Sequence, residues 1–179
     1  MEIRPNKEWL DSIPSQTGWY IAGFVDGEGS FNISMRQRND FSRKWQITLT
    51  FNVSQRDESN LVMMKKLFGI GRLQYRSDGV CYFVVSNPKE IVEKVVPFFN
   101  LYNFSSTTKQ TNFGIFKRVA KMMVKGEHLN DQGLLQIIKL REEINKGRGK
   151  KRKYELYHYL NSQESSEAIR RTSVLPVKI

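Results

Sequence analysis

The sequence predicts an α+β domain in which a four-stranded antiparallel sheet carries helices on one face. Four segments alternate apolar and polar residues, and each successive pair of these segments is joined by a short turn. Segments with apolar residues at helical spacing separate the pairs and follow them, in the order αββαββα and then further helices. Because each alternating segment has only one apolar side, the other face of the sheet is expected to meet water.

Turn and cap residues set the expected limits of these elements. The expected strands span about residues 31–38, 45–53, 71–76 and 80–86. The expected helices span about residues 18–27, 57–68, 87–99, 108–125 and 131–146. Thr17 is expected to cap the first helix, and Gly69 to end the second helix as a C-terminal cap. We expect turns at Asn39-Asp40 and at Ser77-Asp78-Gly79.

The charge balance indicates a polyanionic partner. Lys and Arg number 29 against 18 Asp and Glu, which gives a net charge of +11 among 179 residues. Such a balance produces self-repulsion unless a polyanion offsets it, and nucleic acid is the first candidate. No stretch approaches the roughly 18 apolar residues of a membrane span. The first 14 residues mix both charge signs and lack an apolar run, so we expect an intracellular protein with no membrane association.

Cysteine and histidine are too few to build a metal or disulfide framework. Cys81 is the single cysteine, which excludes an internal disulfide and any cysteine-based zinc site. His128 and His158 lie thirty residues apart without a set of partner ligands. We expect no role for either histidine beyond the protein surface.

The polar side of the expected sheet is rich in groups that can bind DNA. Arginine, amide and hydroxyl side chains can donate hydrogen bonds to phosphates and to base edges. With neighbouring loop residues, the expected contacts are Asn32, Ser34, Arg36, Arg38, Arg43, Lys44, Gln46, Thr48, Asn52, Arg72, Gln74 and Arg76. An ordinary solvated sheet face is the alternative for any one strand. The absence of Asp and Glu from this set favours binding.

Two domain-level segments are expected. Residues 1–146 form one domain with a core at 17–125, and residues 147–179 form a basic linker followed by a C-terminal tail. The linker GRGKKRK could hold phosphates, and the tail is therefore a candidate DNA contact. Basic runs of this kind are also often merely solvated.

The segment Trp19–Ser30, WYIAGFVDGEGS, is unusual for a lone helix. Gly23 and Gly27 are four residues apart, and each disfavours the helix by about 1 kcal/mol, so the close approach of another helix is expected in compensation. Asp26 and Glu28 lie at the C-terminal end, where the helix dipole disfavours negative charge by about 0.3–1 kcal/mol each. Such acids suggest a bound cation. The alternative is that the glycines end the helix and the acids face water.

This segment resembles the signature of the LAGLIDADG family of homing endonucleases, position by position from Ile21 to Gly29. The later run Phe51–Gln55 also resembles the end of the family's second strand, and the resemblance covers about residues 17–125. It implies an αββαββα unit whose signature helix packs against the same helix of a second subunit. The implied interface residues are Ala22, Gly23, Asp26 and Gly27.

The resemblance also implies a reaction, namely metal-dependent hydrolysis of double-stranded DNA by a homodimer at a long pseudo-palindromic site. Glu28 is then the catalytic acid and, with Gly27, a Mg²⁺ ligand. Gln55 is implied as the polar residue that positions water, and Lys109 as a catalytic cation. The sequence departs from the family pattern in having Glu28 where Asp is commoner, and Thr107 at a basic position near Lys109.

Two other functions remain open at this stage. Members of the same family can act as maturases that bind intron RNA, and a non-cleaving DNA-binding regulator could use the same fold. The acid at Glu28 favours cleavage, and residues 126–179 show no clear second DNA-binding module. An organelle or a prokaryotic cytoplasm is the expected location.

Overall fold

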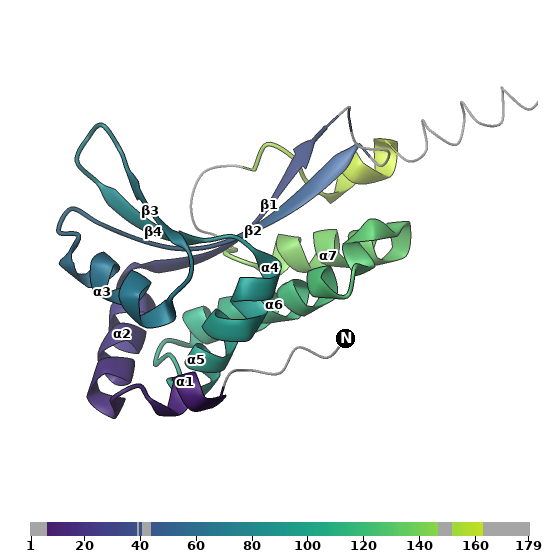
Figure 1. Ribbon diagram of the computed structural model, residues 1–179. Helices are drawn as coiled ribbons and strands as arrows, with labels where there is room; N and C mark the ends of the chain where they lie inside the picture. Colours follow the sequence, from purple (N-terminus) through teal and green to yellow (C-terminus); the bar gives the residue numbers. More distant parts are fainter. Residues whose placement is uncertain (1–6, 39, 41–43, 147–151, 163–179) are drawn as a thin grey trace, which may run out of the picture.

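The computed structural model describes residues 7–38, 40, 44–146 and 152–162 (Figure 1). Its elements are α1 (Lys7–Asp11), α2 (Ser15–Glu28), β1 (Gly29–Gln37), β2 (Trp45–Gln55), α3 (Ser59–Phe68), β3 (Arg72–Tyr75), β4 (Cys81–Val85), α4 (Pro88–Glu90), the π-helix η1 (Ile91–Val95), α5 (Val96–Leu101), α6 (Thr107–Val124), the 3₁₀ helix η2 (Glu127–Leu129) and α7 (Asp131–Glu143). A further helix spans 156–162.

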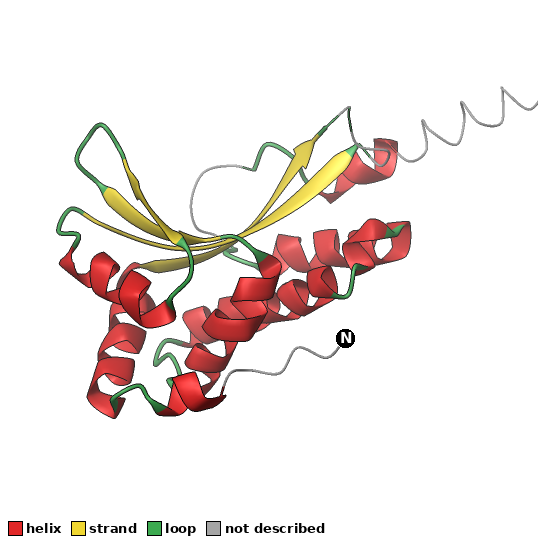
Figure 2. Cartoon of the chain, viewed as in Figure 1, coloured by secondary structure: helices red, strands yellow, loops and turns green. Residues whose placement is uncertain are grey.

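The four strands form one antiparallel sheet in the order β1-β2-β4-β3. Figure 2 shows the main helices on one side of this sheet, while the strands rise toward both ends of the other side and leave it concave. The predicted fold class is therefore confirmed, because buried and less buried residues alternate along β1 and β2. β1 and β3 are the edge strands.

The helix predicted over residues 18–27 is α2, and it begins earlier than predicted. Its first residue is Ser15, after Pro14 in an extended conformation with ψ 131°, and no side chain caps it. Thr17 therefore lies inside α2, and its predicted role as the N-cap is wrong. Proline fixes its own φ and starts a helix without a side-chain cap, which explains the difference. At the other end α2 runs one residue past Gly27, to Glu28.

The other helices follow the predicted ranges closely, with one irregularity. Gly69 ends α3 in the left-handed conformation with φ 64°, as predicted. The helix expected over 87–99 is divided by the π-helical η1, which ends just before Pro97. Since proline has no backbone N–H, the regular helical ladder cannot continue through Pro97, and a local widening accommodates the change.

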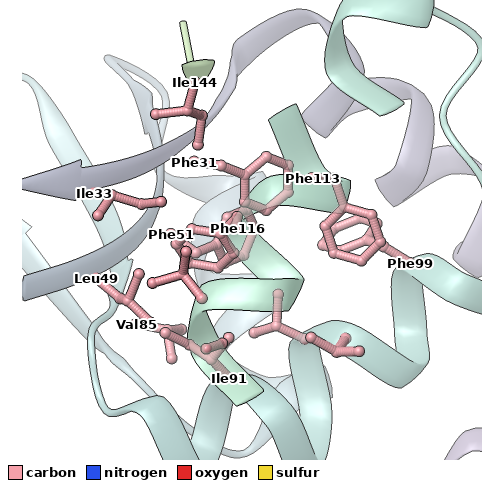
Figure 3. Close-up of a cluster of buried hydrophobic side chains, with 14 of the residues drawn as sticks. Phe31, Ile33, Leu49, Phe51, Val85, Ile91, Phe99, Phe113, Phe116 and Ile144 are labelled. Carbon is pink, nitrogen blue, oxygen red and sulfur yellow. The ribbon is translucent and has the colours of Figure 1, made fainter. Parts of the chain in front are cut away.

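Phe31 lies at the centre of the hydrophobic core beneath the sheet (Figure 3). Its ring centroid lies 5.2 Å from that of Phe51 on β2 and 5.1 Å from that of Phe116 on α6. The rings of Phe99 and Phe113 also contact it, at centroid separations of 6.1 and 5.3 Å. Phe31, two residues after Gly29, thus fixes the start of β1 against the helical layer.

The C-terminal part of the described chain returns to the far end of the first hairpin. The Trp45 indole nitrogen donates a 2.8 Å hydrogen bond to the Ser162 hydroxyl. The rings of Tyr154 and Tyr159 contact the same tryptophan, at 5.2 and 6.5 Å between centroids. Residues 152–162 therefore pack on the domain, whereas 147–151 and 163–179 of the predicted linker and tail lie outside the described residues. None of the helices in the described ranges is long and apolar enough to cross a membrane.

We predict that Gly18→Ala destabilises the fold. A Cβ atom at Gly18 would lie 2.2 Å from Cζ of Tyr102, a buried ring. Overpacking of this kind costs about 1–3 kcal/mol of unfolding free energy. Gly114→Ala on α6 is the matched control, since a Cβ there meets nothing within 4 Å and alanine favours a helix by up to about 1 kcal/mol. Thermal unfolding should show a lower Tm for Gly18→Ala only, and equal Tm values for the two variants would contradict the packing described.

Candidate active site and nucleic-acid interface

Glu28 is the last residue of α2 and is exposed, directly before the first residue of β1. Gly29 pairs with Val53, and β2 ends two residues later at Gln55. Because the two strands are antiparallel, Glu28 and Gln55 lie at the same end of the sheet. Gly29 must be a glycine, because a Cβ there would lie 2.5 Å from Cγ1 of Val25.

Asp26 faces the N-terminus of α6 in its own chain. Its Oδ2 accepts hydrogen bonds from the backbone nitrogens of Ser105 and Ser106, each at 2.9 Å, and its Oδ1 accepts one from the Ser106 hydroxyl. Partial burial alone would raise the pKa of Asp26. The hydrogen bonds from Ser106 and Ser105, with the charge of Lys109, outweigh that effect and hold its pKa below the ordinary value. The predicted interface role of Asp26 stays a prediction, but its carboxylate already accepts hydrogen bonds from Ser105 and Ser106 of its own chain.

Lys109 lies in the first turn of α6 and reaches the same place. Its Nζ donates a hydrogen bond to the backbone oxygen of Gly29. The structure thus brings Lys109, Asp26 and the start of β1 together. The catalytic role implied for Lys109 stays a prediction. We call Asp26, Gly29, Ser105, Ser106 and Lys109 the α2–α6 junction. Thr107, where a basic residue was looked for, is exposed at the start of α6.

Two further side chains bind the outer edge of β1. The Asn145 amide donates to the backbone oxygen of Phe31 at 2.9 Å, and Arg141 Nε donates to that of Ile33 at 3.1 Å. With Lys109 on Gly29, three successive outward carbonyls of this edge strand accept side-chain donors. Covering an edge in this way satisfies its backbone and prevents pairing with another strand.

The helix α7 supplies a buried cation to this edge. Arg141 is 5% exposed, and burial lowers the pKa of its guanidinium, as does the charge of Arg152. Glu142 binds both arginines, at 2.9 Å to Arg141 and 3.0 Å to Arg152. Asn145, which has a positive φ of 55°, exchanges two hydrogen bonds with Asn112 of α6. These contacts join α6, α7 and β1 into one unit.

An open cavity of about 720 Å³ lies along this edge of β1. Its lining comprises Asp26, Gly27, Gly29, Ser30, Phe31, Asn32, Ile33, Ser34, Ser106, Thr108, Lys109, Asn112, Arg141, Ile144, Asn145 and Arg152. It begins beside the end of α2 and continues to the polar face of the sheet. Sequence reasoning did not find Asn112, Arg141 or Asn145, although Arg141 could be suspected from its place on the apolar face of the predicted last helix. Arg152 belongs to the basic run GRGKKRK, which was a candidate phosphate contact.

The predicted DNA contacts on the strands gather on the concave face of the sheet. They alternate with buried residues on β1 and β2, and the strand register places them opposite one another. The pairs include Ser34 with Thr48 and Arg36 with Gln46. The residues that the structure places on this polar face are Asn32, Ser34, Arg36, Gln46, Thr48, Asn52, Arg72 and Gln74. Thr50, Ser54 and Tyr82 share it and were not predicted as contacts.

The predicted arginines are oriented by neighbouring side chains. Arg36 Nε donates to the Gln46 side-chain oxygen at 2.6 Å. Arg76, just after β3, donates to the Tyr82 hydroxyl at 3.0 Å and pairs with Asp78 at 2.9 Å.

The remaining predicted contacts lie in the loop that joins β1 to β2. Arg38 binds Asp40 there, and Lys44 is exposed with a positive φ of 58°. Arg43 lies outside the described residues, as does Asn39 of the predicted turn.

The glycine face of α2 is open in the single chain. A Cβ atom at Gly23 or Gly27 would meet nothing within 4 Å, so the helix that these glycines were expected to accommodate is not part of the described chain. Tyr20 and Phe24 are adjacent on this helix, with parallel rings 6.5 Å apart, and Tyr20 is 52% exposed. Ala22, by contrast, is buried within the chain.

The oxygen donors at the end of α2 fit a hard divalent cation. Glu28 is an exposed carboxylate at a helix end that also presents backbone oxygens, and Mg²⁺ prefers such ligands. Within the described residues, no group of three or more His, Cys, Asp or Glu side chains could hold a metal by itself. A cation held at Glu28 and at backbone oxygens of this helix end would therefore need further ligands from outside these residues.

Comparison with known proteins agrees with these features. The sequence model described as LAGLIDADG endonuclease matches residues 21–120, from the α2 signature into the last third of α6. The chain belongs to the LAGLIDADG endonuclease family. The family resemblance predicted from residues 21–29 is thereby confirmed.

Two solved structures of LAGLIDADG relatives have the same fold. One is an archaeal intron-encoded homing endonuclease, I-Vdi141I, complexed with DNA: its TM-score is 0.77 at 31% identity, over 86% of this chain and 97% of that one. The other is I-SmaMI bound to uncleaved DNA target in the presence of calcium ions, with a TM-score of 0.69 at 29% identity, over 74% of this chain and 46% of that one.

A curated LAGLIDADG relative is longer than this chain. The probable intron-encoded endonuclease 2 of Neurospora crassa is 31% identical over 146 residues, which are 79% of this chain and 30% of that relative. The chain spans less than half of the length of the curated fungal relatives it matches.

We predict that Arg141→Met destabilises this LAGLIDADG domain. The methionine keeps an unbranched apolar stem in place of the arginine methylenes but leaves the buried oxygen of Ile33 without its donor, a loss of about 1–3 kcal/mol. Lys139→Met is the control, because Lys139 is an exposed residue of the same helix and should change stability by about 0.5 kcal/mol or less. Urea unfolding measures both, and a neutral Arg141→Met would show that the edge contacts do not stabilise β1.

Proposed function

We propose that two copies of this chain form a C2 homodimer that cuts both strands of a long, pseudo-palindromic double-stranded DNA site. The observation that carries the proposal is the position of Glu28. It is an exposed acid at the end of a helix whose glycine face is open, and it lies at one end of a concave polar sheet. A dimer through α2 would bring two such acids together between two DNA-binding faces.

The case for a dimer rests on α2 and on the size of the relatives. Gly23 and Gly27 lower the helical propensity of α2, and a second backbone packed against them would compensate. This chain covers 97% of I-Vdi141I but 46% of I-SmaMI. That difference is expected if the longer protein holds two such units in one chain while this chain needs a second copy.

The chemistry proposed is phosphodiester hydrolysis. Glu28, with the backbone oxygen of Gly27, would hold a divalent cation such as Mg²⁺ against the scissile phosphate. When bound, Mg²⁺ supplies charge neutralisation at the phosphate and makes water a better nucleophile. Glutamate in place of aspartate lengthens the reach of the carboxylate by one methylene.

Two other residues have supporting roles in this proposal. Gln55, at the end of β2, can accept and donate hydrogen bonds and would orient the attacking water at the same end of the sheet. Lys109 lies at the α2–α6 junction, where its positive charge would stabilise negative charge that develops on the phosphate.

The concave face would lie along the DNA. Nine residues of β1 at about 3.4 Å each span about 30 Å, which corresponds to about nine base pairs for each subunit. Both structural relatives described above are complexes with DNA. The hydrogen bonds that Arg36 donates to Gln46 and that Arg76 donates to Tyr82 would hold these guanidinium groups ready to read base edges.

Relatives of this chain are encoded in introns, which suggests its biological setting. The Neurospora crassa relative is named as intron-encoded, and so is I-Vdi141I. We propose that this chain likewise acts inside the cell on the genome that encodes it. An organelle as the compartment, and intron RNA as a further partner, stay predictions.

We predict that Glu28→Gln abolishes cleavage and preserves DNA binding. The substitution removes a metal-binding charge without altering the sheet face, and chelation of Mg²⁺ with EDTA should have the same effect on the wild type. Glu143→Gln is the matched control, since Glu143 is also an exposed acid at the end of a helix, α7. Gel assays of cutting and binding measure both variants. Retained cutting by Glu28→Gln would contradict the proposed chemistry.

We predict that Gly23→Leu yields folded monomers that do not cut DNA. A Cβ at Gly23 meets nothing within 4 Å in the single chain, but a leucine there would separate two helices packed at Gly23. Gly114→Leu is the control, because a Cβ at Gly114 on α6 also meets nothing within 4 Å. Sedimentation velocity should show a dimer for the wild type and the control and a monomer for Gly23→Leu. A monomeric wild type would overturn the proposed assembly.

A further inference from the structure

We propose that Asp26 is a positioning residue for Glu28, which acts by fastening the end of α2 to the first turn of α6, and that it is not a metal ligand. This inference rests on the proposed function, because it concerns the same acid. It distinguishes the two carboxylates of the signature, which the sequence places two residues apart at the same helix end.

The oxygens of Asp26 are already used within the chain. Oδ2 accepts from the nitrogens of Ser105 and Ser106 at 2.9 Å each, and Oδ1 accepts from the Ser106 hydroxyl. A cation bound to either oxygen would have to displace these donors. Glu28, in contrast, is exposed and makes no side-chain hydrogen bond to another residue of the described ranges. The two acids therefore differ in what they can still bind.

The charge of Asp26 is placed to suit α6. At the C-terminus of α2 a negative charge is disfavoured by the helix dipole, but the same charge lies at the N-terminus of the 18-residue α6, where it is favoured. Ser106 occupies the N-cap position of α6 without making a side-chain cap bond itself. Asp26 instead supplies the acceptor from 80 residues earlier in the chain. Its unusual position on α2 is explained without a cation.

Glu28 is held on both sides by the same turn of α6. Two residues before it, Asp26 binds Ser105 and Ser106; one residue after it, the Gly29 oxygen accepts from Lys109. The segment that carries Glu28 thus has a fixed position relative to α6, which itself packs on β1 through Phe116. Loss of Asp26 removes one of the two attachments. The carboxylate of Glu28 would then sample more positions, and metal ions would bind less well at the same concentration.

The test compares Asp26→Ala and Asp26→Asn with a matched control, Asp57→Ala. Asp57 is also a helix-capping acid, since its Oδ1 accepts from the Ser59 nitrogen at 2.9 Å at the start of α3, but it is not part of the α2–α6 junction. Three quantities are measured on the full chain: thermal stability, DNA affinity in Ca²⁺, and the single-turnover cleavage rate as a function of Mg²⁺, at a temperature where all variants are folded.

We expect both alanine variants to lower Tm and to keep wild-type DNA affinity. Only Asp26→Ala should need at least ten-fold more Mg²⁺ for half-maximal cleavage, and Asp26→Asn, which keeps one acceptor, should fall between it and the wild type. If Asp26→Ala and Asp57→Ala show the same Mg²⁺ dependence, Asp26 is only structural and the proposal fails. If Asp26→Asn stays as inactive as Glu28→Gln at any Mg²⁺ concentration, Asp26 is a ligand and the proposal fails.

A readout without cleavage separates this inference from the proposed function. Amide hydrogen exchange at Gly29, whose nitrogen donates to the oxygen of Val25, reports the order of the Glu28 segment directly. Asp26→Ala should speed exchange at Gly29 and at Ser106, while Asp57→Ala should not. If the wild type does not cut DNA, the proposed function fails alone, and the exchange result still decides the role of Asp26. Unchanged exchange at Gly29 would overturn the proposal.

Discussion

The outer carbonyls of β1 accept side-chain hydrogen bonds from the helical layer, and the rest of the site depends on this attachment. Lys109, Asn145 and Arg141 bind the oxygens of Gly29, Phe31 and Ile33 in turn. An exposed edge strand would otherwise offer these groups to another chain. The ring of Phe31 also lies at the centre of the core. The first residues of β1 are therefore fixed both along the strand edge and against the helical layer. Glu28, the residue before this strand, takes its position from them.

The arrangement separates two tasks that one sheet has to perform. The apolar side of β1 and β2 holds the helices, and the polar side stays free for a polyanion. Arginines lie on that polar side, such as Arg36 and Arg72, and along the edge of β1, where Arg141 and Arg152 share Glu142. In the proposed dimer, β1 would connect the DNA-binding face to Glu28. Because β1 is held rigidly, DNA bound on that face would lie at a fixed distance from the two acids.

Local sequence patterns were sufficient to predict the fold and the surface of the site. Alternation along residues 31–38 and 45–53 predicted both the strands and their polar face, since side chains on a strand point to opposite sides. Gly69 ends α3 as predicted, because glycine adopts the left-handed conformation at a helix C-terminus without strain. Glu28 is exposed, and a Cβ at Gly23 or Gly27 meets nothing within 4 Å. The metal and interface roles that the signature implies for them stay predictions.

Contacts between distant residues could not be predicted in this way. The partner of Asp26 lies 80 residues away, and Arg141 reaches Ile33 over 108 residues. The signature implied different roles for Asp26 and Glu28, but it did not indicate that Asp26 binds Ser105 and Ser106 of its own chain while Glu28 is exposed. The error at Thr17 has a local cause, since Pro14 determined the start of α2 and no side-chain cap was needed. Helix 156–162 was missed because its docking partner, Trp45, is remote in the sequence.

Selection of cut sites from a random DNA library would show whether two copies of this chain cut one symmetric DNA site. DNA duplexes with a randomised segment of about 24 base pairs, somewhat longer than two spans of about nine base pairs each, would be incubated with the protein and Mg²⁺. The cut molecules are then sequenced. The account predicts a single family of sites with two related, inverted half-sites and a break in both strands between them. Recovery of no cut molecules, or of sites with one half-site and no symmetry, would contradict it.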